Sequence, residues 1–364
     1  MRKSKIFQDI PRYPKTGFSL GLNPFQRGFN SQAITEDALQ SRSRDIQSIK
    51  SLMQQMMTGL GSANTNFPSW RDLQNLQFEN LDSNNFTLIG QYPSSMSNAV
   101  ETYEGIYLGR DKVAIKVVRS VAANEASFCR LKRECNVWKR LWDIDRGKHL
   151  LPYFGFWQTD EAFPHLVSPW PANGNALAYV KQMGNKADYA GLVKGVAVGV
   201  GIVHGIGVAH GDIKASNVAI DMWGNPLISD FGLFRIVEDI TGVPFTESRG
   251  ASDSYRWFAP EVCADQGVLS LSSDVYAYGM TVLELFTHAR PYSDIKHTLE
   301  VVIRAARGEQ PLRPMDNNVL TRGLDDELWG LLTRCWAIIP EERPTIQSVL
   351  DIFGALYSPT QNRG

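Results

Sequence analysis

The most constraining feature of this sequence is a polar loop, His210–Asn217, which is soon followed by the tetrapeptide Ser229–Gly232. The loop contains a carboxylate, a lysine and an amide within six residues, and the tetrapeptide adds a second carboxylate before a Phe-Gly turn. Between them, Val218–Ile220 and Leu227–Ile228 are short apolar runs separated by turn residues, which predicts a hairpin. Hard cations prefer oxygen ligands, so acidic and amide groups at both ends of a hairpin suit a magnesium–phosphate site.

These two segments resemble the catalytic loop and the magnesium loop of the eukaryotic protein kinases, whose patterns are His-Arg-Asp-x-x-x-x-Asn and Asp-Phe-Gly. The resemblance implies that Asp212 accepts the proton of the attacking hydroxyl and that Lys214 contacts the transferred phosphate. It also implies that Asn217 and Asp230 hold Mg²⁺ beside ATP. Asp230 follows Asp212 by eighteen residues, and the two motifs together are far more specific than Asp-Phe-Gly alone.

Asp111-Lys112 reads as a turn, and a single lysine stands inside the β-branched run Val113–Val118 that follows it. Such a lysine must reach an anion or extend to water, and an exposed edge lysine is the simpler interpretation of the run by itself. The run resembles the kinase Val-Ala-Ile-Lys strand, which implies that Lys116 binds the α- and β-phosphates and that Ala114 lies beneath the adenine. The next stretch, 122–141, has helical apolar spacing. The family pairs a glutamate of this helix with the lysine, which implies Glu134; the alternative is a surface pair with the arginine four residues earlier.

Residues 163–170 are expected to form the strand that leads to the hinge between two lobes. Aligned to the family, Ser168 occupies the gatekeeper position at the nucleotide site. The hinge begins at Pro169–Pro171, so that Trp170 is a further candidate for nucleotide binding.

Three later segments also resemble the kinase family. Ala259–Glu261 resembles the Ala-Pro-Glu motif that closes the activation segment, and Ser254 stands where serine/threonine kinases place a hydroxyl near the catalytic aspartate. The resemblance implies that Asp274 braces the catalytic loop and that Arg343 pairs with the glutamate of the Ala-Pro-Glu motif. The Cys-Trp…Pro…Arg-Pro ending is most like tyrosine-kinase-like and tyrosine kinases, whereas Lys214 favours serine/threonine specificity.

The glycine-rich roof over the phosphates is the main departure from the kinase pattern. Its four positions hold Ser95, Ser97, Val100 and Thr102. Glycine allows close backbone approach to phosphate, and each side chain adds bulk there. The sequence therefore leaves open a pseudokinase that acts as a binding or scaffolding module.

The second departure is Gly211, which replaces an arginine that pairs with activation-loop phosphate in other kinases. The absence of this arginine leaves the residues of the phosphoryl-transfer reaction in place. His-Gly-Asp also occurs in small-molecule kinases, but those lack the Ala-Pro-Glu segment and the Cys-Trp…Arg-Pro ending.

Composition limits the remaining function classes. The 364 residues are 43% hydrophobic and 21% charged, with a net charge of −1, which gives no reason to expect nucleic acid or an anionic membrane as a partner. The apolar run 189–209 contains a lysine and a histidine, so a buried helix is expected and not a membrane span. Four cysteines without a Cys-x-x-Cys pair, and no signal peptide, indicate free thiols in the cytoplasm.

We therefore expect an α+β, bilobal protein kinase-like fold over residues 86–356. A small β-rich N-lobe with one helix (86–168) would precede a larger α-helical C-lobe (172–356). Residues 1–80 read as a largely disordered extension with a helix at 45–60, which either docks on its own domain or binds a partner. The expected activity is transfer of the γ-phosphoryl group of ATP, with Mg²⁺, to serine or threonine of a protein substrate.

Overall fold

The computed structural model describes residues 81–96, 100–118, 125–157, 165–230, 254–264 and 269–356. At 118, 125–134, 157, 264 and 356 the described structure is that of the backbone alone. The predicted extension 1–80, with its helix at 45–60, lies outside the described residues.

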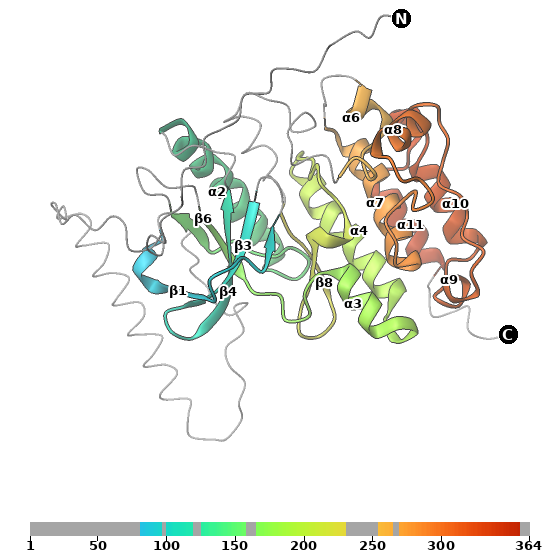
Figure 1. Cartoon of the computed structure of the whole chain (residues 1–364). Coiled ribbons are helices and arrows are strands. Elements are labelled where there is room, and N and C mark those ends of the chain that lie inside the picture. The colour runs from blue at the N-terminus through green and yellow to red at the C-terminus, as the bar shows by residue number, and fades with distance from the viewer. Residues whose placement is uncertain are drawn as a thin grey trace, which may run out of the picture. The chain divides into compact units, whose positions relative to one another are not determined.

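The first part of the described chain is built on one antiparallel sheet. Its strands are β1 (Phe86–Ile89), β2 (Ser95–Met96), β3 (Val100–Tyr107), β4 (Asp111–Val118), β5 (Gly155–Trp157) and β6 (His165–Pro169). Hydrogen bonds join them in the order β1-β3-β4-β6-β5, and β2 pairs with β3. Between β4 and β5 runs one long helix, α2 (Glu125–Asp145), as the sequence predicts (Figure 1).

One local prediction is wrong. Asp111-Lys112 reads as a turn, but both residues belong to β4, and Tyr107 pairs with Asp111 in the ladder. The turn lies at 108–110, where Leu108 and Gly109 have φ values of 53° and 71°. Glycine adopts that left-handed conformation without steric cost. Gly109 therefore favours a turn at 108–110, just before the charged pair Asp111-Lys112.

The second part of the described chain is mainly helical. Its helices and 3₁₀ turns are α3 (Ala176–Met183), η4 (Gly184–Lys186), α4 (Tyr189–Gly205), η5 (Ala215–Asn217), α6 (Pro260–Ala264), α7 (Leu271–Thr287), α8 (Thr298–Ala306), α9 (Asn317–Thr321), α10 (Asp326–Cys335), η8 (Pro340–Glu342) and α11 (Ile346–Leu356). The predicted hairpin forms as β7 (Val218–Ile220) and β8 (Pro226–Ile228). In the part of the chain described, a β-rich lobe with one α-helix therefore precedes a helical lobe, and the predicted α+β, bilobal architecture is confirmed (Figure 1).

Close packing of α4 brings the hairpin against the helical core. A Cβ atom built on Gly195 would lie 2.5 Å from a ring carbon of Pro226, and one on Gly199 would lie 2.6 Å from a side-chain carbon of Ile228. Side chains cannot be accommodated at such distances, so these two glycines let β8 approach the helix. The buried helix expected within 189–209 is confirmed as α4. Among the described residues, no helix has the length and hydrophobicity to cross a membrane.

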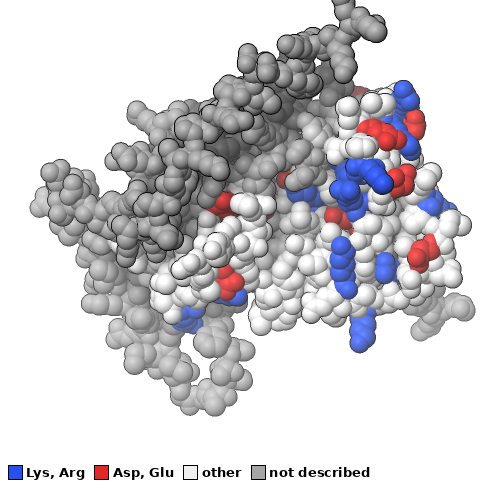
Figure 2. Space-filling model, in the orientation of Figure 1, with Lys and Arg blue, Asp and Glu red and all other residues white. Residues whose placement is uncertain are grey.

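Helix α7 forms the centre of the helical lobe. Fourteen consecutive residues, Ser273–Phe286, are buried, including the carboxylates of Asp274 and Glu284. A carboxylate inside a core needs hydrogen-bond donors, and both of these find them in the segments that carry the candidate active site. On the face drawn in Figure 2, basic and acidic side chains are both scattered over this lobe, so that face carries mixed charge.

Candidate active site

The loop His210–Asn217 is held in place by Asp274, which is 1% exposed. One carboxylate oxygen of Asp274 accepts from the backbone N–H of His210 at 2.6 Å, and the other accepts from that of Gly211 at 2.8 Å. The expectation that Asp274 braces the loop is confirmed. Gly211 has a φ of 86°, a conformation that L side chains rarely adopt, so glycine suits this position of the loop.

The buried imidazole of His210 joins the two polar segments that the sequence singles out. Its Nε2 lies 2.9 Å from the carbonyl oxygen of Ser229, which immediately precedes Asp230. Its Nδ1 accepts from the backbone N–H of Asp212 at 3.2 Å. The ring therefore fixes the distance between the segments that carry the two aspartates.

The carboxylate of Asp212 is bound on one side only. Its Oδ2 accepts from Nδ2 of Asn217 at 2.8 Å and forms an ion pair with Nζ of Lys214 at 2.9 Å. Its Oδ1 is buried and has no hydrogen-bond partner among the described residues. A buried carboxylate oxygen without a donor is rare, and its use as a proton acceptor stays a prediction.

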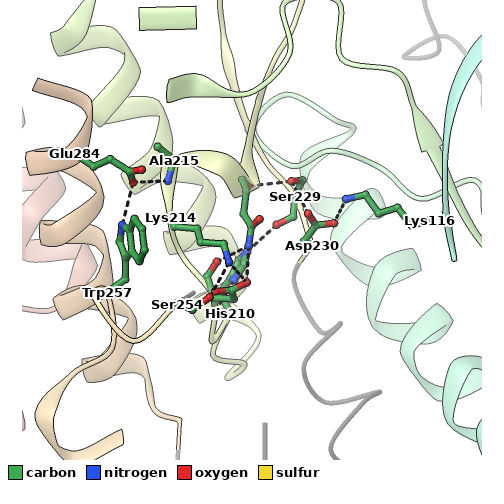
Figure 3. Close-up of polar contacts among 11 residues, drawn as sticks. Lys116, His210, Lys214, Ala215, Ser229, Asp230, Ser254, Trp257 and Glu284 are labelled. Atoms are coloured by element: carbon green, nitrogen blue, oxygen red, sulfur yellow. Dashed lines mark hydrogen bonds and ion pairs between the residues drawn. The ribbon is translucent and has the colours of Figure 1, made fainter. Parts of the chain in front are cut away.

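Lys214 connects the loop His210–Asn217 with Ser254, which lies in the described segment 254–264. Its ammonium donates to the hydroxyl of Ser254 at 2.7 Å as well as contacting Asp212 (Figure 3). Ser254 is fully buried. The serine that the alignment places near Asp212 is thus connected to it through the Lys214 side chain.

Lys116 of β4 forms an ion pair with Oδ1 of Asp230 (Figure 3). The same oxygen also accepts from the phenol of Tyr153 at 3.0 Å. Burial alone would raise the pKa of Asp230, but the charge and hydrogen bond of Lys116, together with the bond from Tyr153, lower that pKa below its ordinary value. Asp230 is therefore ionised at neutral pH. Its backbone is left-handed, with a φ of 65°.

Asn217 and Asp230 offer the oxygen atoms that a hard cation needs. The amide nitrogen of Asn217 is used by Asp212, so planar amide geometry turns its Oδ1 away from that carboxylate. Ser229 connects the two candidate ligands, because its hydroxyl lies 3.0 Å from the Asn217 carbonyl oxygen and 3.4 Å from Oδ2 of Asp230. Mg²⁺ is usually held by one or two protein side chains plus water and phosphate oxygens, and this donor set fits it.

The three residues expected around the adenine lie on neighbouring strands. Ala114 of β4 pairs with Ser168 of β6, and both are nearly fully buried. Trp170 follows β6; its backbone N–H donates to the carbonyl oxygen of Lys112 at 3.1 Å, and the Lys112 ammonium lies 4.9 Å from the centre of its ring. The structure brings these residues together, and their contacts with a nucleotide stay a prediction.

Two predicted features are described only in part. Glu134 lies in α2, but its side chain is outside the described residues, so its pairing with Lys116 stays a prediction. In the roof, Ser95 pairs with Thr102 in a β2–β3 ladder, while 97–99 lie outside the described residues. The four residues that pair in this ladder therefore do so without a glycine among them.

Two site residues have no counterpart among the sequence predictions. Tyr153 lies in an apolar stretch that gives no sign of a polar role. Glu284 is a lone carboxylate in an apolar run of α7, a signal that could have been found. Its Oε2 accepts from the backbone N–H of Ala215 at 3.0 Å and from Nε1 of Trp257 at 2.9 Å (Figure 3). Burial raises the pKa of Glu284 to about 7, although these hydrogen bonds partly oppose the shift.

The Glu284→Gln variant is expected to lose less stability than the wild type as pH rises from about 5 to about 8. The folded pKa of Glu284 is about 7 and its ordinary value is 4.5, so between them the folded protein binds more protons than the unfolded chain. The free energy of unfolding therefore falls as pH rises through this range, by at most about 3 kcal/mol. Urea unfolding at about pH 5 and about pH 8 should show a smaller fall in the variant than in the wild type. Equal falls would show that Glu284 titrates near its ordinary pKa.

Comparison with known proteins adds an independent line of evidence. The sequence profile of the family described as protein tyrosine and serine/threonine kinase matches residues 98–353. Tyrosine-protein kinase Src64B of Drosophila melanogaster is 27% identical over 255 residues. That match covers 69% of this chain and 43% of the relative, so the chain spans less than half the length of that protein.

Proposed function

Because the chain belongs to the protein tyrosine and serine/threonine kinase family, we propose that it transfers the γ-phosphoryl group of ATP to serine or threonine hydroxyls of protein substrates. The observation that carries this proposal is the arrangement around Asp212, where one carboxylate oxygen is held by two donors and the other is buried and unpartnered. Such an oxygen is suited to receive the proton of an attacking hydroxyl group.

In this proposal the other site residues position phosphate and neutralise charge. Bound Mg²⁺ would supply positive charge at the phosphate oxygens, and Asn217 and Asp230 would hold it. Lys116 would bind the α- and β-phosphates, and Lys214 would contact the phosphate during transfer. Phosphoryl transfer asks for little covalent chemistry from the protein, so these contacts would carry most of the rate enhancement.

The choice of serine or threonine as acceptor is supported by Lys214 and Ser254. Lys214 contacts both Asp212 and the Ser254 hydroxyl, the arrangement expected beside the acceptor in serine/threonine kinases. The relative Src64B is named a tyrosine kinase, and a tyrosine acceptor is the alternative outcome of any transfer experiment. We also propose a cytoplasmic location, in line with the free thiols of Cys135, Cys263 and Cys335.

A binding or scaffolding module is the second candidate. It is favoured by the roof, in which no family glycine is present, because side chains there reduce room for the phosphates. The two candidates differ in what they require of Mg²⁺·ATP.

ATP with Mg²⁺ is expected to stabilise the folded protein. At about 100 times its dissociation constant, a ligand that binds only the folded state adds ~2.7 kcal/mol, which corresponds to an increase in Tm of roughly 5–10 °C for a domain of this size. Thermal melting with ATP and Mg²⁺, and with ATP and a chelator as control, measures this directly. The absence of any Mg²⁺-dependent increase would favour the binding module.

A further inference from the structure

We propose that Tyr153 is a positioning residue for Asp230, whose hydroxyl fixes Oδ1 of that carboxylate so that Oδ2 is presented to the cation of Mg²⁺·ATP. This inference rests on the proposed function, since it concerns the same nucleotide site.

The ring of Tyr153 is fixed by its surroundings. The side chain is 1% exposed and stacks on Trp138 of α2, with ring centroids 4.4 Å apart and an interplanar angle of 23°. Its hydroxyl then lies 3.0 Å from Oδ1 of Asp230. Stacked aromatic rings in a close-packed core leave little freedom to the group that they carry, so the direction of this hydrogen bond is set before any ligand arrives.

Asp230 has a particular need for such a donor. Its backbone is left-handed, with a φ of 65°, a strained conformation for a non-glycine residue that persists where surrounding contacts hold it. The contacts that hold its side chain at Oδ1 are Lys116 and Tyr153. If Lys116 moves to the phosphates of a nucleotide, as the proposed function requires, Tyr153 still donates to Oδ1 of Asp230.

The other carboxylate oxygen is more loosely bound. Oδ2 of Asp230 has a long contact of 3.4 Å with the hydroxyl of Ser229, and that hydroxyl also lies 3.0 Å from the carbonyl oxygen of Asn217. A firmly bound Oδ1 beside a loosely bound Oδ2 is the arrangement that leaves one oxygen available to a cation. Outer groups that orient a metal ligand in this way commonly affect metal affinity 10- to 100-fold.

The chemistry of the two groups agrees with this role. A phenol O–H is a hydrogen-bond donor and an ionised carboxylate only accepts. A hydrogen bond to a charged acceptor is stronger than one between neutral groups.

The test compares Tyr153→Phe with the wild type in their requirement for Mg²⁺. The ring and its stacking remain, and only the hydroxyl is lost. At a fixed ATP concentration, the Mg²⁺ concentration that gives half of the full increase in Tm is expected to rise about tenfold or more in the variant. This midpoint does not depend on catalytic activity.

Tyr278→Phe is the matched control. Tyr278 is fully buried in α7, and its hydroxyl donates at 3.0 Å to the carbonyl oxygen of Val193, so this variant also loses one buried hydrogen bond. We expect it to lower the Tm without ligand and to leave the Mg²⁺ midpoint unchanged. A wild-type midpoint in Tyr153→Phe would overturn the positioning role and leave the proposed function standing. A wild-type protein that shows no Mg²⁺-dependent increase with ATP would overturn both.

Discussion

An Asp212→Asn variant is expected to transfer phosphate about 10²- to 10⁴-fold more slowly than the wild type. The amide can keep its oxygen toward Asn217 and Lys214, the two donors that hold Oδ2 of Asp212. Its NH₂ group then occupies the place of the unpartnered Oδ1. An amide NH₂ donates hydrogen bonds and cannot accept the proton of a hydroxyl group. The kcat for ADP release with a serine-containing protein substrate is the measurement.

The same variant provides its own control for binding. Asp212 is not a proposed cation ligand, so the increase in Tm with ATP and Mg²⁺ should match that of the wild type. A variant that folds, binds Mg²⁺·ATP and keeps more than about a tenth of the wild-type kcat would contradict the role of Asp212 as general base.

An Arg343→Ala variant is expected to lose about 3–5 kcal/mol of stability. The guanidinium makes a bidentate pair with Glu261, at 2.7 and 2.8 Å, as the sequence predicts. It also donates to the carbonyl oxygens of Ala337 at 2.8 Å and Ser272 at 3.1 Å, and lies 5.2 Å from the ring centre of Tyr276. The Arg343 side chain is fully buried, so its removal leaves the partly buried carboxylate of Glu261 and two carbonyl oxygens without their donor.

The exposed pair of Arg304 with Glu300 is the matched control for this prediction. These side chains are 39% and 47% exposed and lie one helical turn apart in α8, at 2.7 Å. Arg304→Ala should therefore destabilise the protein far less than Arg343→Ala, because water screens an exposed ion pair. Urea unfolding of the two variants and the wild type gives both values. Similar losses in both variants would contradict the claim that burial makes the Arg343 pair important.

Much of the fold was predictable because its signals are local. The β-branched run around Lys116 forms β4, the glycine-spaced apolar run from Tyr189 forms α4, and turn residues place the β7–β8 hairpin. The pair of Arg343 with Glu261 is distant in sequence, and only a family resemblance could have suggested it. The turn at 108–110 was missed because two charged residues in β4 resemble a turn more than the leucine and glycine before them do.

Parts of the candidate site were not predictable because their roles arise from tertiary contacts. Tyr153 follows an apolar stretch, and its hydroxyl acquires a partner only when α2 and the end of β8 come together. The hydroxyl of Ser168 is buried and has no hydrogen-bond partner among the described residues, a state that no sequence pattern reveals. The unpartnered Oδ1 of Asp212 depends on which donors reach its carboxylate, and hence on three-dimensional geometry.

The most direct test of the proposed function is phosphate transfer from γ-labelled ATP with Mg²⁺, to the protein itself and to a generic protein substrate, followed by identification of the labelled amino acids. We expect label in phosphoserine or phosphothreonine with the wild type and its loss with Asp212→Asn. Label in phosphotyrosine would contradict the proposed acceptor. If neither the wild type nor Asp212→Asn transfers label while both proteins are folded, the assignment of this chain as an active kinase is contradicted.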